Sequence, residues 1–264
     1  MESKTGKVPI WRLTEESSQH LEDVVVREFP LTIILNNQEV VTLLCSPKDL
    51  EYLAIGFLVS EGLISHKDEI KQLTVDEPRG EVQVATEDDK VLANRLGARR
   101  FIASGGGRGA TAYSTTEVTN QTKIESRIKI STGEVFALMD EFIQRSEVFR
   151  ATGGVHSAAL CDTRGILVFN EDIGRHNAID KIFGECFLKD IATDERVVIT
   201  SGRISSEILL KVAKRNIPIL ISKSAPTDVG VSLASDLGMT LLGFVRGKRI
   251  NAYANDWRIA HHGK

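Results

Sequence analysis

The sequence contains few cysteines, and no two of them lie close together in the chain. The three, Cys45, Cys161 and Cys186, each sit in an apolar stretch. They therefore outline neither a disulfide framework nor a thiolate metal site, and we expect them to be buried small hydrophobic residues. The motifs of zinc deaminases are also missing, because no Cys-x-x-Cys exists and His156 is not followed by x-Glu. No metal site is predicted.

Long apolar runs are absent as well. No stretch approaches the roughly 18 apolar residues of a membrane-spanning helix, and the first residues lack the pattern of an export signal. The 264 residues are 42% hydrophobic and 26% charged, which is typical of a protein of one or two domains located in the cytoplasm. The net charge of −3 would repel a long phosphate backbone, so neither nucleic acid nor membrane is an expected partner.

The stretch 196–227 predicts the unit around which the chain is organised. Two short β-branched runs, 197–200 and 219–221, are typical of buried parallel strands, and the apolar spacing between them predicts a helix. Each run is followed by hydroxyl, glycine and basic residues, at the position where open α/β sheets bind ligands. Plain helix capping is the alternative role for the hydroxyl groups. The candidate anion-binding residues are Ser201, Gly202, Arg203, Lys223, Ser224 and Thr227.

Positive charge is concentrated in the same part of the chain. Residues 196–249 hold nine Lys or Arg against three acids, an excess that suits an anionic ligand. Three of these cations lie in the predicted turn 246–249, between strands at 240–245 and 250–254. A basic hairpin turn is usually solvated surface, but this one follows a buried strand in a domain short of acids.

The first half of the chain predicts a mobile arm at 1–20 and a small α+β domain at 21–120 that is similar to a ubiquitin-like roll. A loop with four glycines at 104–110 ends this domain, as a mobile linker or as a lid over a ligand. The expected elements are hairpin strands at 29–35 and 40–44, a helix at 46–61, and strands at 73–75 and 82–85.

The second half, 121–264, predicts a larger α/β domain. A capping box begins a helix at Ser131, a strand pair covers 152–160 and 166–169, and another helix covers 227–237. A polar cluster lies at the start of the helix that follows the strand pair. It could serve acid–base chemistry or bind an anion. The common alternative is a buried histidine whose hydrogen bonds are all made to its neighbours. The cluster consists of His156, Glu171, Asp172, Arg175, His176 and Asn177.

Five motifs in this order closely resemble the FdhD family of formate dehydrogenase accessory proteins. They are Thr152-Gly-Gly-Val-His156, Glu171-Asp-Ile-Gly-Arg-His-Asn177, Thr200-Ser-Gly-Arg203, Ser224-Ala-Pro-Thr227 and Gly243-Phe-Val-Arg-Gly-Lys-Arg249. The resemblance implies a cytoplasmic homodimer whose main domain is cytidine-deaminase-like. It also implies a sulfurtransferase that passes persulfide sulfur from a cysteine desulfurase to the molybdenum bis(molybdopterin guanine dinucleotide) used by formate dehydrogenase.

The resemblance also implies where this cofactor binds, with GDP as a mimic. The matching segment is Phe244, Val245, Arg246, Gly247, Lys248 and Arg249. The remaining motif residues would line the same cavity. These are His156, Arg175, His176, Asn177, Ser201, Gly202, Arg203, Lys223, Ser224 and Thr227.

One departure from the family concerns the sulfur carrier itself. The family has a Cys-x-x-Cys loop where, in the best register, this chain has Gly106 and Gly109; a shift by one residue would place Gly105 and Arg108 there. Neither register supplies a thiol, so no persulfide can form on this loop. Either another cysteine substitutes, or the chain is a cofactor- and guanine-nucleotide-binding chaperone that does not transfer sulfur. A third class, a nucleotide-hydrolysing or deaminating enzyme with His156 or His176 as the base, is disfavoured because metal ligands are missing.

Overall fold

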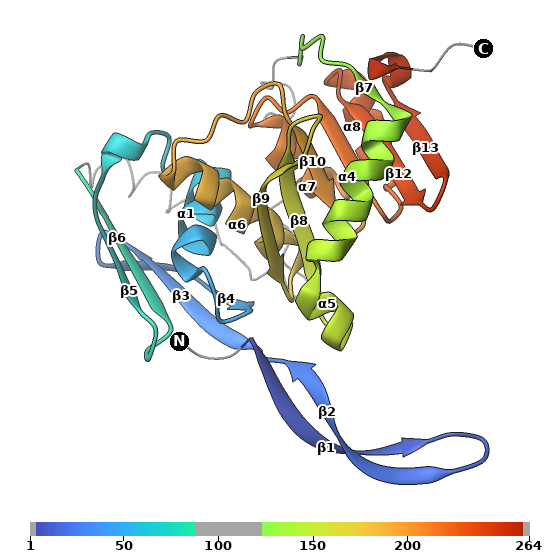
Figure 1. Cartoon of the computed structure of the whole chain (residues 1–264). Coiled ribbons are helices and arrows are strands. Elements are labelled where there is room, and N and C mark those ends of the chain that lie inside the picture. Colours follow the sequence, from blue (N-terminus) through green and yellow to red (C-terminus); the bar gives the residue numbers. More distant parts are fainter. Residues whose placement is uncertain (1–3, 88–122, 261–264) are drawn as a thin grey trace.

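The predicted strand–helix–strand unit forms the centre of a six-stranded sheet (Figure 1). The computed structural model describes residues 4–87 and 123–260. In spatial order the sheet contains β13 (Arg249–Ala254), β12 (Thr240–Arg246), β11 (Ile219–Ser222), β10 (Val197–Thr200), β8 (His156–Cys161) and β9 (Ile166–Asp172). The pairs β10–β11 and β11–β12 are parallel, whereas the outer pairs are antiparallel. The carboxyl ends of β10, β11 and β12 therefore share one edge of the sheet.

Helices cover both faces of this sheet, because its central strands are apolar on both sides. Helices α6 (Arg175–Leu188), α7 (Ser206–Ala213) and α8 (Asp228–Asp236) pack on one face, and α4 (Thr132–Arg145) packs on the other. The predicted capping box begins α4, since Ser131 Oγ accepts a hydrogen bond from the Glu134 N–H at 3.2 Å. Beside α4 lie the paired strands β7 (Ile130–Ser131) and β14 (Ile259–Ala260), the latter preceded by the 3₁₀ turn η2 (Asp256–Arg258).

A four-stranded sheet forms the second part of this mixed α/β molecule. Its order is β4 (Gln38–Cys45), β3 (Phe29–Leu35), β6 (Glu81–Thr86) and β5 (Ile70–Asp76), with the 3₁₀ turn η1 (Lys67–Glu69) before β5. These strands and helix α1 (Leu50–Ser60) confirm the elements predicted for this region. The apolar spacing predicts one buried face for α1, but the helix is buried nearly all round because α6 packs on its other side (Figure 1).

Buried polar contacts join the two parts of the molecule. Asp172 at the end of β9 pairs with Lys181 of α6 at 2.7 Å, and both side chains are completely buried. Asp172 also accepts a hydrogen bond from the Ser46 N–H at 3.0 Å, and Lys181 Nζ donates to the Ser46 carbonyl at 3.2 Å. The preceding residue of α6, Asp180, accepts a hydrogen bond from Ser60 Oγ at 2.8 Å. The segments at both ends of α1 are thus fixed to α6.

Most of the segment predicted as a mobile arm, 1–20, forms regular structure. Strands β1 (Thr5–Leu13) and β2 (Ser18–Val26) form an antiparallel hairpin that extends away from the body (Figure 1). The ring of Trp11 stacks on that of its cross-strand partner His20, with the centroids 4.7 Å apart. Pairing within the hairpin satisfies the backbone groups, so the hairpin forms without the apolar alternation that sequence analysis relies on.

One strand of the six-stranded sheet is shorter than predicted. The strand expected over 152–160 begins only at His156, because helix α5 (Glu147–Thr152) precedes it and ends at Gly153 with a φ of 66°. The Gly-rich loop at 104–110 and the boundary between the two predicted domains lie outside the described residues. Within residues 4–87 and 123–260, no helix is long and apolar enough to cross a membrane.

Candidate functional site

The sheet topology brings the five motifs to one edge. Thr200 at the end of β10 is level with Ser222 at the end of β11, and the same residue pairs with Ala158 near the start of antiparallel β8. His156 at the start of β8 pairs in turn with Asp172, just before α6 begins. The carboxyl ends of the parallel strands, the start of β8 and the start of α6 therefore converge, as expected for a ligand site in an open α/β sheet.

Hydroxyl groups fix the loops at this edge. Ser201 Oγ accepts a hydrogen bond from the Ser157 N–H at 3.0 Å and lies 3.2 Å from His156 Nδ1. Ser222 Oγ donates to the Gly202 carbonyl at 2.7 Å and accepts from the Ser224 N–H at 2.9 Å. Neighbouring strands thus hold one another's loops, which keeps the edge rigid before any ligand arrives.

Capping accounts for one of the predicted anion-binding hydroxyl groups. Thr227 Oγ1 accepts a hydrogen bond from the Gly230 N–H at 3.1 Å and so caps α8. Ser205, which sequence analysis did not single out, caps α7 in the same way through the Ile208 N–H. For Thr227 the alternative of plain capping therefore describes what its side chain does in this structure.

Five cations line this edge, and we call Arg175, Arg203, Lys223, Arg246 and Arg249 the basic edge. Burial lowers the pKa of Arg175, the nearby Arg203 lowers it further, and Glu207 opposes the shift. Arg175 Nε is buried and has no hydrogen-bond partner. Arg203, Arg246 and Arg249 are exposed. Among residues 4–87 and 123–260, none of the five forms an ion pair with a carboxylate.

Aromatic rings lie against several of these cations. Lys223 Nζ is 5.7 Å from the centroid of the Phe149 ring, and the guanidinium carbons of Arg246 and Arg249 are each 5.8 Å from that of Phe244. Arg246 Nε also donates to the Lys223 carbonyl at 2.9 Å. The rings limit the freedom of the cations without neutralising them, so their charge remains available to an anion.

Phe244 has a backbone conformation that sequence analysis could not foresee. Its φ is 49°, in a region that a bulky side chain rarely adopts, and the register of β12 with β13 shifts between Gly243 and Arg246. The Phe244 N–H donates to the Ser224 carbonyl at 3.0 Å, which holds the strained residue in place. Backbone strain of this kind is typical of functional sites. Here the strained residue carries the ring that lies beside Arg246 and Arg249.

Gly202 permits a close approach at the edge. A Cβ atom at this position would lie 3.0 Å from Arg175 Cβ and 3.5 Å from His156 Nδ1. Its part in the Ser-Gly-Arg motif is therefore steric, because a larger residue would push Arg175 away from β10. Gly247, also in the predicted cofactor segment, supplies the positive φ of 55° in the two-residue turn between β12 and β13.

The two histidines of the polar cluster are poor proton acceptors. Burial lowers the pKa of His176 to about 3, with further lowering by Lys211, Arg175 and His156. Burial, followed by Arg175, also lowers the pKa of His156. His176 Nε2 lies 3.5 Å from the Glu207 carboxylate. A base this weak does not suit proton abstraction near neutral pH, so the contacts favour a positioning role for His176 over catalysis.

The carboxylates and the amide of the cluster hold structure together. Asn177 is buried, and its Nδ2 donates to the Leu44 carbonyl and to Asp172 Oδ1, each at 2.9 Å. Glu171 accepts hydrogen bonds from the N–H groups of Val148 and Phe149, at 3.2 and 3.1 Å. Asn177 thus faces the four-stranded sheet, whereas Glu171 places α5, and with it Phe149, beside Lys223.

All three cysteines are buried, as predicted. Burial is the main cause that raises the pKa of Cys45 and of Cys186, each to about 12. Burial likewise raises the pKa of Cys161, with Glu141 adding to the shift. None of these thiols is poised to form a thiolate at neutral pH.

Comparison with known proteins gives a consistent result. The chain matches the model of the FdhD/NarQ family over residues 26–260. The sulfur carrier protein FdhD of Bacillus subtilis (strain 168) is 45% identical over 250 residues, 95% of each chain. That of Staphylococcus aureus (strain MRSA252) is 39% identical over 251 residues, again 95% of each. The crystal structure of a formate dehydrogenase accessory protein from Desulfotalea psychrophila has a TM-score of 0.80 at 26% identity, over 98% of this chain and 100% of that one.

Proposed function

Because the chain belongs to the FdhD/NarQ family, we propose that it takes part in the maturation of formate dehydrogenase by binding the enzyme's molybdenum cofactor at the basic edge. Its relatives are named sulfur carrier proteins, and its structural neighbour is a formate dehydrogenase accessory protein. The cargo would be molybdenum bis(molybdopterin guanine dinucleotide), whose nucleotide carries phosphates that the cations can bind.

The observation that carries this proposal is the unpaired charge of the basic edge. Arg175 Nε is buried without a hydrogen-bond partner, and Arg203 lies close enough to lower the pKa of Arg175. An anion would supply the missing acceptor and relieve the repulsion between the two arginines. The Phe244 ring beside Arg246 and Arg249 adds an apolar surface for a base.

Equilibrium binding of GDP to the full chain tests this assignment. We expect Arg203→Ala and Arg246→Ala each to lose about 1.5–3 kcal/mol of binding free energy, as for a charge-assisted contact, which is about 10- to 150-fold in Kd. Arg164→Ala is the matched control. This exposed residue follows β8, whose end pairs with the start of β10, so it lies at the opposite edge of the sheet from the basic edge. The assignment fails if the parent does not bind GDP, or if Arg164→Ala weakens binding as much as the other two.

The sulfur step admits a second candidate function. In the family-standard version the chain passes sulfur from a cysteine desulfurase to the cofactor, which needs a reactive thiol. Gly106 and Gly109 replace the family's cysteines, and the three cysteines present are buried with raised pKa values. These observations favour a chaperone that holds and delivers the cofactor without itself carrying the sulfur.

A labelled-sulfur assay with a cysteine desulfurase separates the two versions. We expect no label on the parent and label on the double variant Gly106→Cys/Gly109→Cys, whereas Gly133→Cys, an exposed thiol on α4, serves as the control. Label on Cys45, Cys161 or Cys186 of the parent would establish the family-standard version.

We further propose that the four-stranded part is a ubiquitin-like roll, that the six-stranded part is cytidine-deaminase-like, and that the protein is a cytoplasmic homodimer. One helix on four strands supports the first, and a central sheet between helical layers supports the second. The projecting hairpin, with Trp11 and Leu13 exposed, supports a self-association surface. A sedimentation mass of one chain would contradict the dimer.

A further inference from the structure

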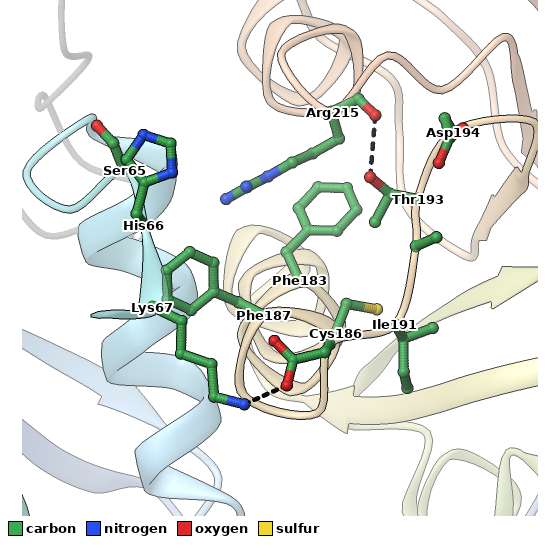
Figure 2. Close-up of a pocket in the computed structure, with 12 residues that line it drawn as sticks. Ser65, His66, Lys67, Phe183, Cys186, Phe187, Ile191, Thr193, Asp194 and Arg215 are labelled. Atoms are coloured by element: carbon green, nitrogen blue, oxygen red, sulfur yellow. Dashed lines mark hydrogen bonds and ion pairs between the residues drawn. The ribbon is translucent and has the colours of Figure 1, made fainter. Parts of the chain in front are cut away.

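A cavity of about 470 Å³ lies between the two parts of the molecule. Figure 2 shows the side chains that line it. Ser65, His66 and Lys67 line it from the segment before β5, and Phe183 and Phe187 line it from the second half of α6. The other walls are residues 190–194, which precede β10, and Arg215, which precedes β11. The cavity therefore lies beside the amino ends of the parallel strands, whereas the basic edge lies at their carboxyl ends.

One charged group in this cavity, Arg215, has a donor without a hydrogen-bond partner. Arg215 Nη2 is buried and has no hydrogen-bond partner. The guanidinium carbon lies 5.6 Å from the centroid of the Phe183 ring, and Figure 2 shows the side chain reaching across the cavity towards His66. A buried donor without an acceptor is destabilising. An anionic group in the cavity would satisfy it.

The fixed parts of the wall show that the site is preformed. Thr193 Oγ1 donates to the Arg215 carbonyl at 3.1 Å, which ties two wall segments together. Lys67 forms an ion pair with Asp190 and so links the two parts of the molecule at the cavity. Burial lowers the pKa of Arg215, and Asp180 and Cys186 oppose this shift. The residue as a whole is half-buried, and its Nη2 atom is buried.

The wall also limits the kind of ligand. Phe187 offers a partly exposed aromatic ring, whereas Phe183 is buried next to the Arg215 guanidinium. The exposed Asp190 and Asp194 disfavour a molecule with several negative charges. The volume is within the range of about 300–1,000 Å³ that is usual for small-molecule sites. One negative charge and a planar apolar body meet these conditions.

We propose that this cavity binds a small aromatic carboxylate, with the carboxylate on the Arg215 guanidinium and the ring against Phe187. Such a site is separate from the cofactor site proposed above. It bridges the segment before β5 and helix α6, so an occupant would contact both parts of the molecule.

Calorimetric titration of the full chain with 3-phenylpropionate tests the proposal, with the uncharged 3-phenylpropionamide and inorganic phosphate as comparison probes. We expect 3-phenylpropionate to bind at least about tenfold more tightly than either, the equivalent of about 1.4 kcal/mol. Arg215→Met should weaken its binding at least tenfold, whereas Arg164→Met, the same change on a remote exposed turn, should not. Ala192→Trp should also weaken binding, because the new ring fills the cavity while Arg215 stays.

The outcomes are separable from those of the cofactor proposal. GDP affinity should be the same in Arg215→Met and in the parent, because the basic edge is untouched. The carboxylate site is refuted if the parent does not bind 3-phenylpropionate, if the amide or phosphate binds as well, or if both Arg215→Met and Ala192→Trp retain parental affinity. Loss of GDP binding alone would refute the cofactor site and leave this one standing.

Discussion

Breaking the buried Asp172–Lys181 pair should destabilise the protein through the contact between its two parts. Lys181→Met removes the cation that lies 2.7 Å from Asp172 in a site where neither side chain reaches solvent. The carboxylate then keeps its hydrogen bonds from Ser46, Gly174 and Asn177 but has no counter-charge. Removing one partner of a buried pair costs about 3–5 kcal/mol, and the three remaining donors place the expected loss near the lower end.

The double variant Asp172→Asn/Lys181→Met identifies the cause of this loss. It removes the uncompensated charge, so we expect it to recover at least about 1 kcal/mol relative to Lys181→Met alone. Full recovery is not expected, because the amide that replaces the Asp172 carboxylate can accept through one oxygen only and would place its own donors against the Ser46 or Gly174 N–H.

Equilibrium urea unfolding, followed by two spectroscopic probes, measures these differences. Lys189→Met is the matched control, because Lys189 directly after the same helix pairs with Glu185 at 2.7 Å but is exposed. Its midpoint should stay close to that of the parent. If Lys181→Met and Lys189→Met unfold at the same urea concentration, the buried pair does not hold the two parts together.

Two further predictions concern stability. Burial holds the pKa of His176 near 3, against an ordinary value of 6.5. Between these two pH values the unfolded chain binds a proton that the folded chain does not, so stability falls as the pH drops from about 6.5 towards 3, by up to about 1.4 kcal/mol per pH unit. The urea midpoint of His176→Gln should fall less steeply with pH, and a slope equal to the parent's would contradict this. Gly184→Ala should prevent stable folding, because its Cβ would lie 1.9 Å from the Tyr52 carbonyl oxygen, whereas Gly133→Ala on α4 has space and should raise the thermal midpoint slightly.

Local patterns predicted most elements of the fold, and the exceptions have nonlocal causes. The strands and helix of the small sheet, the capping box at Ser131 and the parallel pair β10–β11 follow from spacing and turn residues. The hairpin at the amino end was missed because its stability comes from cross-strand pairing. The full burial of α1 was missed because it depends on α6, which lies more than a hundred residues later. No periodicity within a helix reports such a contact.

The same distinction separates the candidate site from its framework. The motifs identified which residues meet at the basic edge, but not what each one does there. Thr227 caps a helix, Asn177 holds the small sheet, and His176 is held neutral by burial, whereas Arg175 keeps a donor without an acceptor. A motif contains residues with different roles, and a scaffold that keeps the proposed anion site rigid needs helix caps and structural hydrogen bonds as much as ligand-binding side chains. The residues most worth testing for binding are therefore the cations that the framework leaves unpaired, and the framework residues belong in stability measurements.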